Sequence, residues 1–239
     1  MLKEDQTFCR SFCNSEIVGE DTFKYTASYV IFSMCERYLV FTGRPNAGKS
    51  SIIREVVGLD VATGKRPGTT RRISKYPLSG DLVLVDMPGF GRMMGASKRL
   101  EDKKNDQIIK FLESYAQSIA LAVHVLDIST FLEVTWRLEK KGFISVDVEM
   151  VQFLTETLGK FPLVAANKID KANKKELEVN LEEFIHQIGK GYPFAVGEHV
   201  FPVSAKTGEG LGALKNSIHK RLVAKGYRTP FKAPRLTTI

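Results

Sequence analysis

The 239-residue chain has little cysteine and no long apolar run, and each shortage excludes a class of protein. Its three cysteines, Cys9, Cys13 and Cys35, are odd in number and crowd the N-terminal segment, so they do not make a disulfide framework. Cys9 and Cys13 could contribute to a metal site, but no second Cys/His pair stands nearby at zinc-ligand spacing, which favours free thiols. No segment approaches the roughly 20 apolar residues of a membrane helix, and the first residues lack the apolar core of a secretory signal. We therefore expect a cytoplasmic protein that is not embedded in a membrane.

Acidic residues are also in short supply relative to basic ones. The chain has 27 Asp and Glu against 35 Lys and Arg, which gives a formal net charge of +8 and a pI of about 9.3. Such an excess favours polyanionic partners such as RNA. Between residues 211 and 239 no acidic residue occurs, and the basic ones are Lys215, Lys220, Arg221, Lys225, Arg228, Lys232 and Arg235. This segment is either an RNA-contacting surface or a solvated helix face and tail.

An alternation of strand-like and helix-like segments begins at about Glu36 and predicts an α/β domain whose sheet is mostly parallel. The expected strands are residues 37–42, 72–77, 82–86, 119–126, 161–166 and 199–203. The expected helices are residues 50–57, 101–115, 147–158, 174–188 and 211–224. Ser79-Gly80-Asp81 has the chemistry of a hairpin turn, so the edge strand 72–77 should run antiparallel to its neighbour.

A glycine-rich loop with the pattern G-x-x-x-x-G-K-[ST] follows the first expected strand and precedes the first expected helix, which is the context that this pattern requires. Its residues are Gly43, Arg44, Pro45, Asn46, Ala47, Gly48, Lys49 and Ser50. The glycines let the backbone wrap around a phosphate, and successive N–H groups at a helix N-terminus attract its charge. Lys49 can reach the β- and γ-phosphates, and the Ser50 hydroxyl can bind Mg²⁺. The loop therefore predicts a site for a nucleoside triphosphate.

The residues that select the base are expected after two later strands. One group is Asn167-Lys168-Ile169-Asp170, and the other is Val203-Ser204-Ala205-Lys206. The Asp170 carboxylate can accept hydrogen bonds from N1–H and the 2-amino group of guanine, whereas adenine lacks that amino group and would leave the charge unpaired. Lys168 can cover the flat base, Asn167 can tie its loop to the glycine-rich loop, and the Ala205 N–H can meet guanine O6. Because open α/β sheets bind ligands at the carboxyl ends of their strands, these motifs together predict GTP or GDP as the ligand.

Two further motifs are expected to respond to the third phosphate. In Asp86-Met87-Pro88-Gly89, Asp86 would hold Mg²⁺ and the Gly89 N–H would contact the γ-phosphate. Gly68-Thr69-Thr70-Arg71-Arg72 offers a threonine hydroxyl that would complete the Mg²⁺ shell with GTP bound and leave it after hydrolysis. The expected metal ligands are thus Ser50, Asp86 and either Thr69 or Thr70. The basic segment 92–104 is either a mobile switch loop or an ordinary surface loop.

Taken together, the motifs resemble those of the TrmE–Era–EngA–EngB group of translation GTPases, and they are most similar to the EngB type in its archaeal form. The matching stretches are residues 45–51 (P-N-A-G-K-S-S), 67–70 (P-G-T-T), 86–91 (D-M-P-G-F-G) and 124–129 (H-V-L-D-I-S), within a resemblance that covers about residues 37–225. The resemblance implies a Ras-like domain of six strands flanked by helices, and it selects Thr70 over Thr69. It also implies a role in assembly of the large ribosomal subunit and a family link to cell division and septation. Bacterial members usually carry threonine in place of Asn167 and have a shorter connection than residues 130–146.

The residue after the D-x-x-G motif is Phe90, whereas Ras-like enzymes usually have a glutamine there that orients the attacking water. A slow, Mg²⁺-dependent GTPase is therefore expected, and its candidate catalytic residues are Lys49, Thr70 and Asn46. The resemblance implies that Asn46 could help to hold K⁺ beside the phosphates, although a purely structural role for Asn46 is also open. The possible charge donors, which could equally be ordinary solvated side chains, are Arg71, Arg72 and Arg92.

The expected organisation is an N-terminal extension over residues 1–35, an EngB-type GTPase domain over residues 36–226 and a basic tail over residues 227–239. Met34 stands just before the first expected strand, so we hypothesise that the native chain starts there; the intact mass of the protein from its own cell would test this. The expected partners are GTP or GDP and ribosomal RNA or the large ribosomal subunit, and the expected protein is a monomer. Two other functions stay open, namely a GTP/GDP-sensing scaffold with negligible hydrolysis and a helper in tRNA modification.

Overall fold

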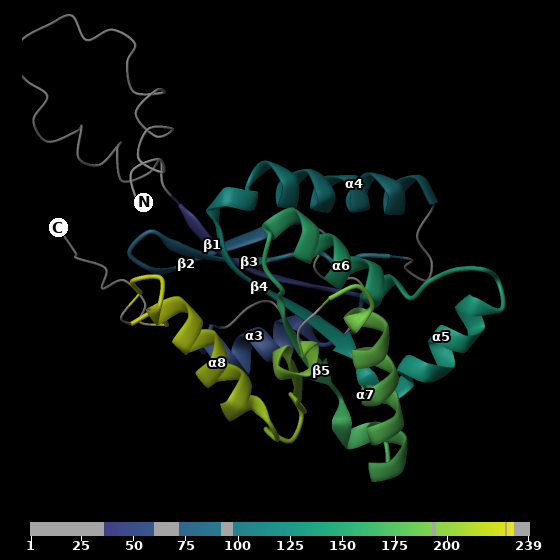
Figure 1. The fold of residues 1–239 in the computed structure, drawn as a ribbon. Coiled ribbons are helices and arrows are strands. Elements are labelled where there is room, and N and C mark those ends of the chain that lie inside the picture. The colour runs from purple at the N-terminus through teal and green to yellow at the C-terminus, as the bar shows by residue number, and fades with distance from the viewer. Residues whose placement is uncertain (1–35, 60–71, 92–97, 193–194, 228, 232–239) are drawn as a thin grey trace, which may run out of the picture. The chain divides into compact units, whose positions relative to one another are not determined.

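In the computed structural model the chain divides into two units, residues 1–34 and residues 35–239. The structure describes residues 36–59, 72–91, 98–192, 195–227 and 229–231, all of which belong to the second unit. The centre of this unit is a six-stranded sheet with the strand order β2-β3-β1-β4-β5-β6 (Figure 1).

The strands are β1 (Arg37–Gly43), β2 (Ser74–Ser79), β3 (Leu82–Asp86), β4 (Ile119–Asp127), β5 (Leu163–Asn167) and β6 (Val200–Pro202). Neighbouring strands are parallel except for β2 and β3, which form an antiparallel pair. Because β2 is an edge strand and pairs on one side only, Pro77 is tolerated within it. A mostly parallel sheet with one antiparallel edge strand confirms the predicted fold class.

The helices are α3 (Lys49–Val57), α4 (Lys98–Ser114), α5 (Phe131–Glu139), α6 (Val146–Leu158), α7 (Lys174–Gly189) and α8 (Leu211–Val223). Helices α3 and α8 cover one face of the sheet, while α4, α6 and α7 cover the other (Figure 1). Short 3₁₀ turns occur at Ala116–Ser118, Ile128–Thr130, Ile169–Lys171 and Val196–His199. Within the described ranges, none of the helices is both long and apolar enough to cross a membrane.

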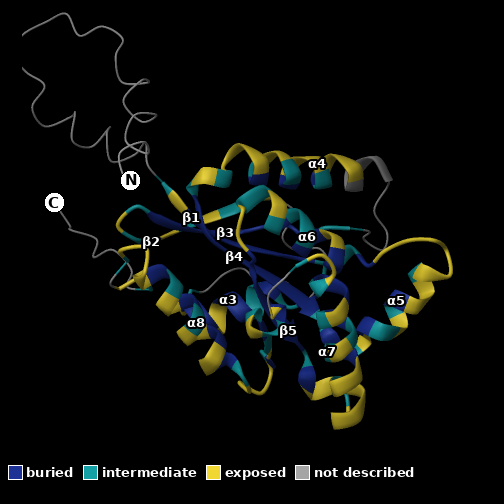
Figure 2. Ribbon diagram, in the orientation of Figure 1, coloured by how far each residue is buried: buried dark blue, intermediate teal, exposed yellow. Residues whose placement is uncertain are grey.

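The central strand β1 shows why both faces of the sheet are covered. Successive side chains of a strand point to opposite faces. Leu39 and Phe41 pack into the cluster that contains α3 and α8, whereas Tyr38 and Val40 pack into the one that contains α4 and α6. All four are buried, as are most positions of the neighbouring strands (Figure 2). A run that is apolar at every position is therefore what a parallel strand buried on both faces requires.

Several element boundaries differ from the predicted ones for local reasons. The strand predicted over 161–166 begins only at Leu163, because Pro162 has no N–H to donate to a ladder. The strand predicted over 199–203 is only Val200–Pro202, since the residues before it form a 3₁₀ turn. The strand predicted over 72–77 is Ser74–Ser79, and it runs two residues further into the hairpin.

Helix α5 was not predicted. Its sequence is rich in β-branched and aromatic residues, and its inward side, Phe131, Thr135 and Leu138, extends over only two turns and has a polar residue in the middle, so the helical pattern is easily missed. Its first turn is satisfied from a distance, because the Leu132 N–H donates to Asn180 Oδ1 of α7 at 2.7 Å. A cap supplied by a residue 48 positions away leaves no local signal in the sequence.

Candidate functional site

Four loops gather at the edge of the sheet where its parallel strands end. They are the glycine-rich loop 43–50 after β1, residues 86–89 at the end of β3, residues 167–170 at the end of β5 and residues 203–206 after β6. The first two loops are joined by a hydrogen bond from the Phe90 N–H to Gly43 O at 3.1 Å. The second of these loops is buried at Met87, Pro88 and Gly89. This edge is where open α/β sheets bind their ligands.

The glycine-rich loop packs closely on two neighbouring loops, and a glycine stands at each point of contact. Gly48 has φ +98°, and a Cβ there would lie 2.2 Å from Asn167 Nδ2. A Cβ at Gly89 would lie 2.6 Å from the Pro45 nitrogen. Neither position has room for a side chain, so glycine is needed for the loops to pack on each other. Gly48 also immediately precedes α3, whose first N–H groups therefore lie at the loop.

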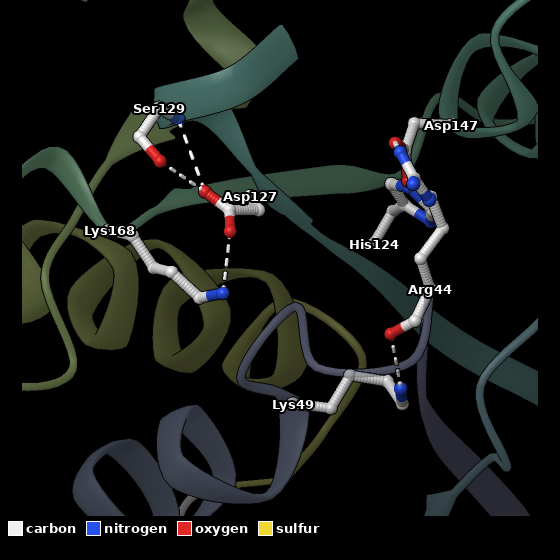
Figure 3. Close-up of polar contacts among 7 residues, drawn as sticks. All are labelled: Arg44, Lys49, His124, Asp127, Ser129, Asp147 and Lys168. Atoms are coloured by element: carbon white, nitrogen blue, oxygen red, sulfur yellow. Dashed lines mark hydrogen bonds and ion pairs between the residues drawn. The ribbon is translucent and has the colours of Figure 1, made fainter. Parts of the chain in front are cut away.

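Lys49 turns back into the glycine-rich loop (Figure 3). Its Nζ donates to the backbone oxygens of Gly43 and Arg44, each at 3.1 Å, and the residue is 7% exposed. Burial lowers the pKa of Lys49 to about 8 against the opposing attraction of Asp86. The ammonium group has thus exchanged water for two neutral carbonyl oxygens, and a phosphate at the loop would supply the negative charge that these carbonyls lack.

Asp86 and Ser50 form the part of the site that could hold a metal ion. Ser50 Oγ donates to Asp86 Oδ2 at 3.2 Å. The other carboxylate oxygen, Asp86 Oδ1, is buried and has no hydrogen-bond partner among the described residues. Burial raises the pKa of Asp86, and the charge of Lys49 and the hydrogen bond from Ser50 oppose that rise. A buried, unpartnered carboxylate oxygen beside a hydroxyl suits Mg²⁺, which takes oxygen ligands and completes its shell with substrate phosphates.

The predicted base-binding residues are held by one another. Asn167 Nδ2 donates to Ala47 O at 2.8 Å, and Asn167 Oδ1 accepts from the Ala205 N–H at 3.0 Å. Asn167 therefore ties its loop to the glycine-rich loop and also to the loop after β6. Ser204 Oγ donates to Asp170 Oδ1 at 2.7 Å, and this hydrogen bond lowers the pKa of the Asp170 carboxyl. An ionised carboxylate held in one orientation is an acceptor suited to two neighbouring N–H donors.

Asp127 is a member of the site that the sequence did not predict. Its Oδ2 pairs with Lys168 Nζ at 2.5 Å, and its Oδ1 accepts from both the N–H and the hydroxyl of Ser129 (Figure 3). This ion pair fixes the Lys168 side chain beside the base-binding loop. A second ion pair joins the exposed Lys206 to Asp170, with 3.8 Å between Lys206 Nζ and Asp170 Oδ2. The available signal was position, because Asp127 ends β4 at the same edge as the predicted motifs.

A second unpredicted group holds Arg44. Its Nη1 pairs with Asp147 Oδ2 of α6 at 3.3 Å, and Asp147 Oδ1 lies 3.2 Å from His124 Nε2 of β4 (Figure 3). His124 Nδ1 in turn lies 3.1 Å from Thr42 Oγ1 of β1. Apart from Arg44, these side chains are buried, so the group is a polar cluster inside an apolar core. It fixes the start of the glycine-rich loop against α6.

Part of the predicted site lies outside the described residues. The predicted positions there are Gly68, Thr69, Thr70, Arg71 and Arg92. Arg72 is described and is exposed. Phe90 is half-buried, and its ring packs against the apolar cluster of α4 and α6. An apolar ring in that environment has no group with which to orient a water molecule.

Known proteins resemble this chain over most of its length. A family model described as 50S ribosome-binding GTPase matches residues 38–168. The probable GTP-binding protein EngB of Methanopyrus kandleri is 43% identical over 79% of this chain and 94% of its own length. The protein of the same description from Archaeoglobus fulgidus is 35% identical over 82% of this chain and 96% of its own length. The chain belongs to the EngB family of GTP-binding proteins.

Solved structures agree with this EngB assignment. The crystal structure of a probable GTP-binding protein engB has a TM-score of 0.69 and 36% identity, and the match covers 78% of this chain and 99% of that one. Aquifex aeolicus Era bound to GDP and AlF4⁻ has a TM-score of 0.53 and 25% identity, with 79% of this chain and 57% of Era covered. The EngB-type chain is therefore a GTP-hydrolysing enzyme of Ras-like fold.

Replacing Lys49 with methionine should stabilise the nucleotide-free protein and abolish GTP binding. The difference between a pKa of about 8 and the ordinary 10.5 means that burial disfavours the charged lysine by about 3 kcal/mol at pH 7. The loss of two hydrogen bonds to carbonyl groups offsets about 2 kcal/mol of this. We expect the free energy of unfolding in urea to rise by about 1 kcal/mol.

The pH dependence of that difference provides a second test. The pKa of Lys49 is lower in the folded than in the unfolded chain. The loss of stability caused by burying the charged lysine is therefore complete below pH 8, and it is relieved as the pH rises towards 10.5. The wild type should therefore gain about 3 kcal/mol of stability relative to Lys49→Met over this range, so that the difference between them falls to zero and then changes sign. Lys110→Met, at an exposed position of α4, is the matched control and should show no such pH dependence. A Lys49→Met protein that is less stable than the wild type at pH 7 would contradict the burial argument.

Proposed function

We propose that the chain is a Mg²⁺-dependent GTPase of low intrinsic rate whose nucleotide state controls its association with a precursor of the large ribosomal subunit. The nucleotide part rests on the Asp170 carboxylate, which Ser204 orients at the edge of the sheet that carries the glycine-rich loop. The ribosomal part is supported by the description of the matching family model and by the net charge of +8.

Selection of guanine follows from the charge of Asp170. One carboxylate can accept from both N1–H and the 2-amino group, while adenine would leave a negative charge without a donor. The Ala205 N–H already donates to Asn167 Oδ1, so a contact with guanine O6 would be shared with that bond or would draw on a neighbouring N–H. Lys168, held at its end by Asp127, would cover one face of the base.

On the phosphate side, Lys49 would exchange its two carbonyl partners for the β- and γ-phosphates. Ser50 and Asp86, joined by a hydroxyl from Thr70, would hold Mg²⁺. When bound, the ion neutralises the negative charge of the phosphate chain. The Gly89 N–H would contact the γ-phosphate and so report whether that group is present.

The half-buried ring of Phe90 supports the low intrinsic rate. With no glutamine at this position, hydrolysis has to depend on positioning by the loop, on the metal and on a charge supplied from elsewhere. The same observation favours a second candidate function, a nucleotide-sensing scaffold for which hydrolysis is incidental.

Asp170→Asn should exchange the base preference of the site. The amide presents a donor where guanine also has one, whereas xanthine offers an acceptor there. We expect the affinity for GTP to fall by about 1,000-fold and the affinity for xanthosine triphosphate to rise, measured by displacement of a fluorescent nucleotide. Asp127→Asn is the matched control, because it weakens the hold on Lys168 and leaves the preference for guanine unchanged. Retained GTP affinity in Asp170→Asn would refute the role given to Asp170.

The wild-type protein should hydrolyse GTP faster in K⁺ than in Na⁺ at equal ionic strength, because the Asn46 amide helps to hold K⁺ beside the phosphates. Asn46 has φ 63°, a left-handed conformation that glycine adopts without strain, so Asn46→Gly keeps the backbone and removes only the amide. If the amide oxygen helps to hold K⁺, turnover of Asn46→Gly should lose its preference for K⁺ and fall to the rate in Na⁺. Equal wild-type rates in the two salts would leave Asn46 with its structural role alone.

Large ribosomal subunits should accelerate hydrolysis in a single turnover, with enzyme in excess over GTP. The subunit would supply the positioning that Phe90 cannot, so the expected change is an increase of at least about tenfold. Small subunits at the same concentration are the control. If the protein binds large subunits more tightly with GTP than with GDP but hydrolysis stays unchanged, the scaffold function is the correct one.

A further inference from the structure

A positively charged cleft lies at the edge of the sheet opposite the glycine-rich loop. It has a volume of about 580 Å³ and is lined by the start of β1, the start of β4, the end of α6 and the segment that follows α8. Parallel strands begin at one edge of a sheet and end at the other, so this cleft and the nucleotide site are separated by the length of the strands. The four nucleotide loops contribute no residue to this cleft, whereas the basic segment 211–239 contributes Lys225 and Tyr227.

Three basic side chains from three different elements meet in the cleft. They are Arg37 at the start of β1, Lys160 between α6 and β5, and Lys225 after α8. The acidic member of the described lining is Glu156, and Asp81 nearby is hydrogen-bonded to Tyr227. In the part of the chain that the structure describes, no carboxylate forms an ion pair with Lys160 or Lys225. The cleft therefore carries an excess of positive charge that the protein itself does not neutralise.

The two lysines are close enough to disturb each other. Burial lowers the pKa of Lys225, and so do its contact with the Lys160 ammonium group and the charge of Arg37. A folded protein gains nothing from bringing these cations together, because like charges repel. A bound anion would reverse the repulsion, and Arg37, which spends one donor on Gln117 O at 2.6 Å, has further N–H groups to offer.

From this geometry we propose that the cleft of Arg37, Lys160 and Lys225 binds the phosphodiester backbone of RNA. Backbone phosphates are spaced charges on a narrow strand, which can enter a recess, whereas the flat surface of an acidic membrane cannot. A second hollow of about 250 Å³ has a mostly apolar lining, shares Lys160 and Lys225 with the cleft and adds one further cation, Arg221, to the path that a strand of phosphates would follow. The proposal rests on the ribosomal role only for the source of the RNA.

The position of the cleft also suits an RNA contact that coexists with nucleotide turnover. Its lining comes from the starts of strands and the ends of helices, and it includes no residue of the four nucleotide loops. A strand of RNA in the cleft would leave the glycine-rich loop open to GTP. Arg221, near the end of α8, and Lys225, just after it, lie along the same path.

The test uses the full chain with Lys160 and Lys225 both changed to glutamine, and a fluorescein-labelled 20-nucleotide oligouridine as the probe. Fluorescence anisotropy is measured over a series of salt concentrations. We expect the affinity to fall by about tenfold, and the slope of log K against log salt to become shallower by about 1.4, which is about 0.7 for each contact with a phosphate of a single strand. Lys160→Arg with Lys225→Arg keeps both charges and should restore binding.

Lys103→Gln with Lys110→Gln is the matched control, because it removes the same charge from exposed positions of α4. An equal loss of RNA affinity in this control would overturn the proposal, as would unchanged affinity in the Lys160/Lys225 variant. So would wild-type protein that binds vesicles of phosphatidylserine or inorganic phosphate but not the RNA. Unchanged GTP affinity and an unchanged unfolding midpoint show that the variant is folded. The ribosomal role is tested separately, by the binding of wild-type protein to large subunits. If the protein binds the RNA normally but does not bind large subunits, the ribosomal role fails and the RNA site does not.

Discussion

A single buried amide, that of Asn167, connects three of the four loops that form the proposed nucleotide site. Its Nδ2 donates to Ala47 in the glycine-rich loop, and its Oδ1 accepts from Ala205 in the loop after β6. Gly48 packs so closely against the same amide that no side chain fits between them. Because Asn167 ends a buried strand, the positions of these loops are set by the sheet and by each other. The phosphate half and the base half of the site therefore share one rigid support.

The electrostatics of this edge are unfavourable for the protein on its own. Lys49 is a buried cation among neutral carbonyls, and Asp86 is a buried carboxylate with one oxygen unpaired among the described residues. Burial shifts the pKa of both groups toward their neutral forms. A nucleotide phosphate would supply negative charge to the first and a metal ion positive charge to the second. The ligand-free protein is thus less stable because of these two buried charges, and a ligand of the opposite charge at each position would restore that stability.

Most of the fold, and the meeting of the predicted loops at one edge of the sheet, could be predicted, because their signals are local. The hydrophobic runs of the strands and the contiguous loop Gly43–Ser50 can each be recognised within a few residues. The groups that were missed are non-local. Helix α5 takes its cap from Asn180, and Arg44 is fixed by Asp147, which lies 103 residues further along the chain. Charge in the cleft was visible only as a basic C-terminal segment, since Arg37 and Lys160 reach Lys225 only through folding.

Helix α6, like the strands β1 and β4, reaches both edges of the sheet. Near its start, Asp147 pairs with Arg44 of the glycine-rich loop, and near its end Glu156 and Leu158 line the basic cleft. A helix of this length spans about 20 Å, much the same as a strand of β1's length, so one rigid body bridges the distance between the two sites. The buried contact of Asp147 with His124 anchors that body to the central strands. Arg44 at the glycine-rich loop is thus held by a helix whose far end lines the basic cleft, and the buried Asp147–His124 contact fixes that helix to the sheet between them.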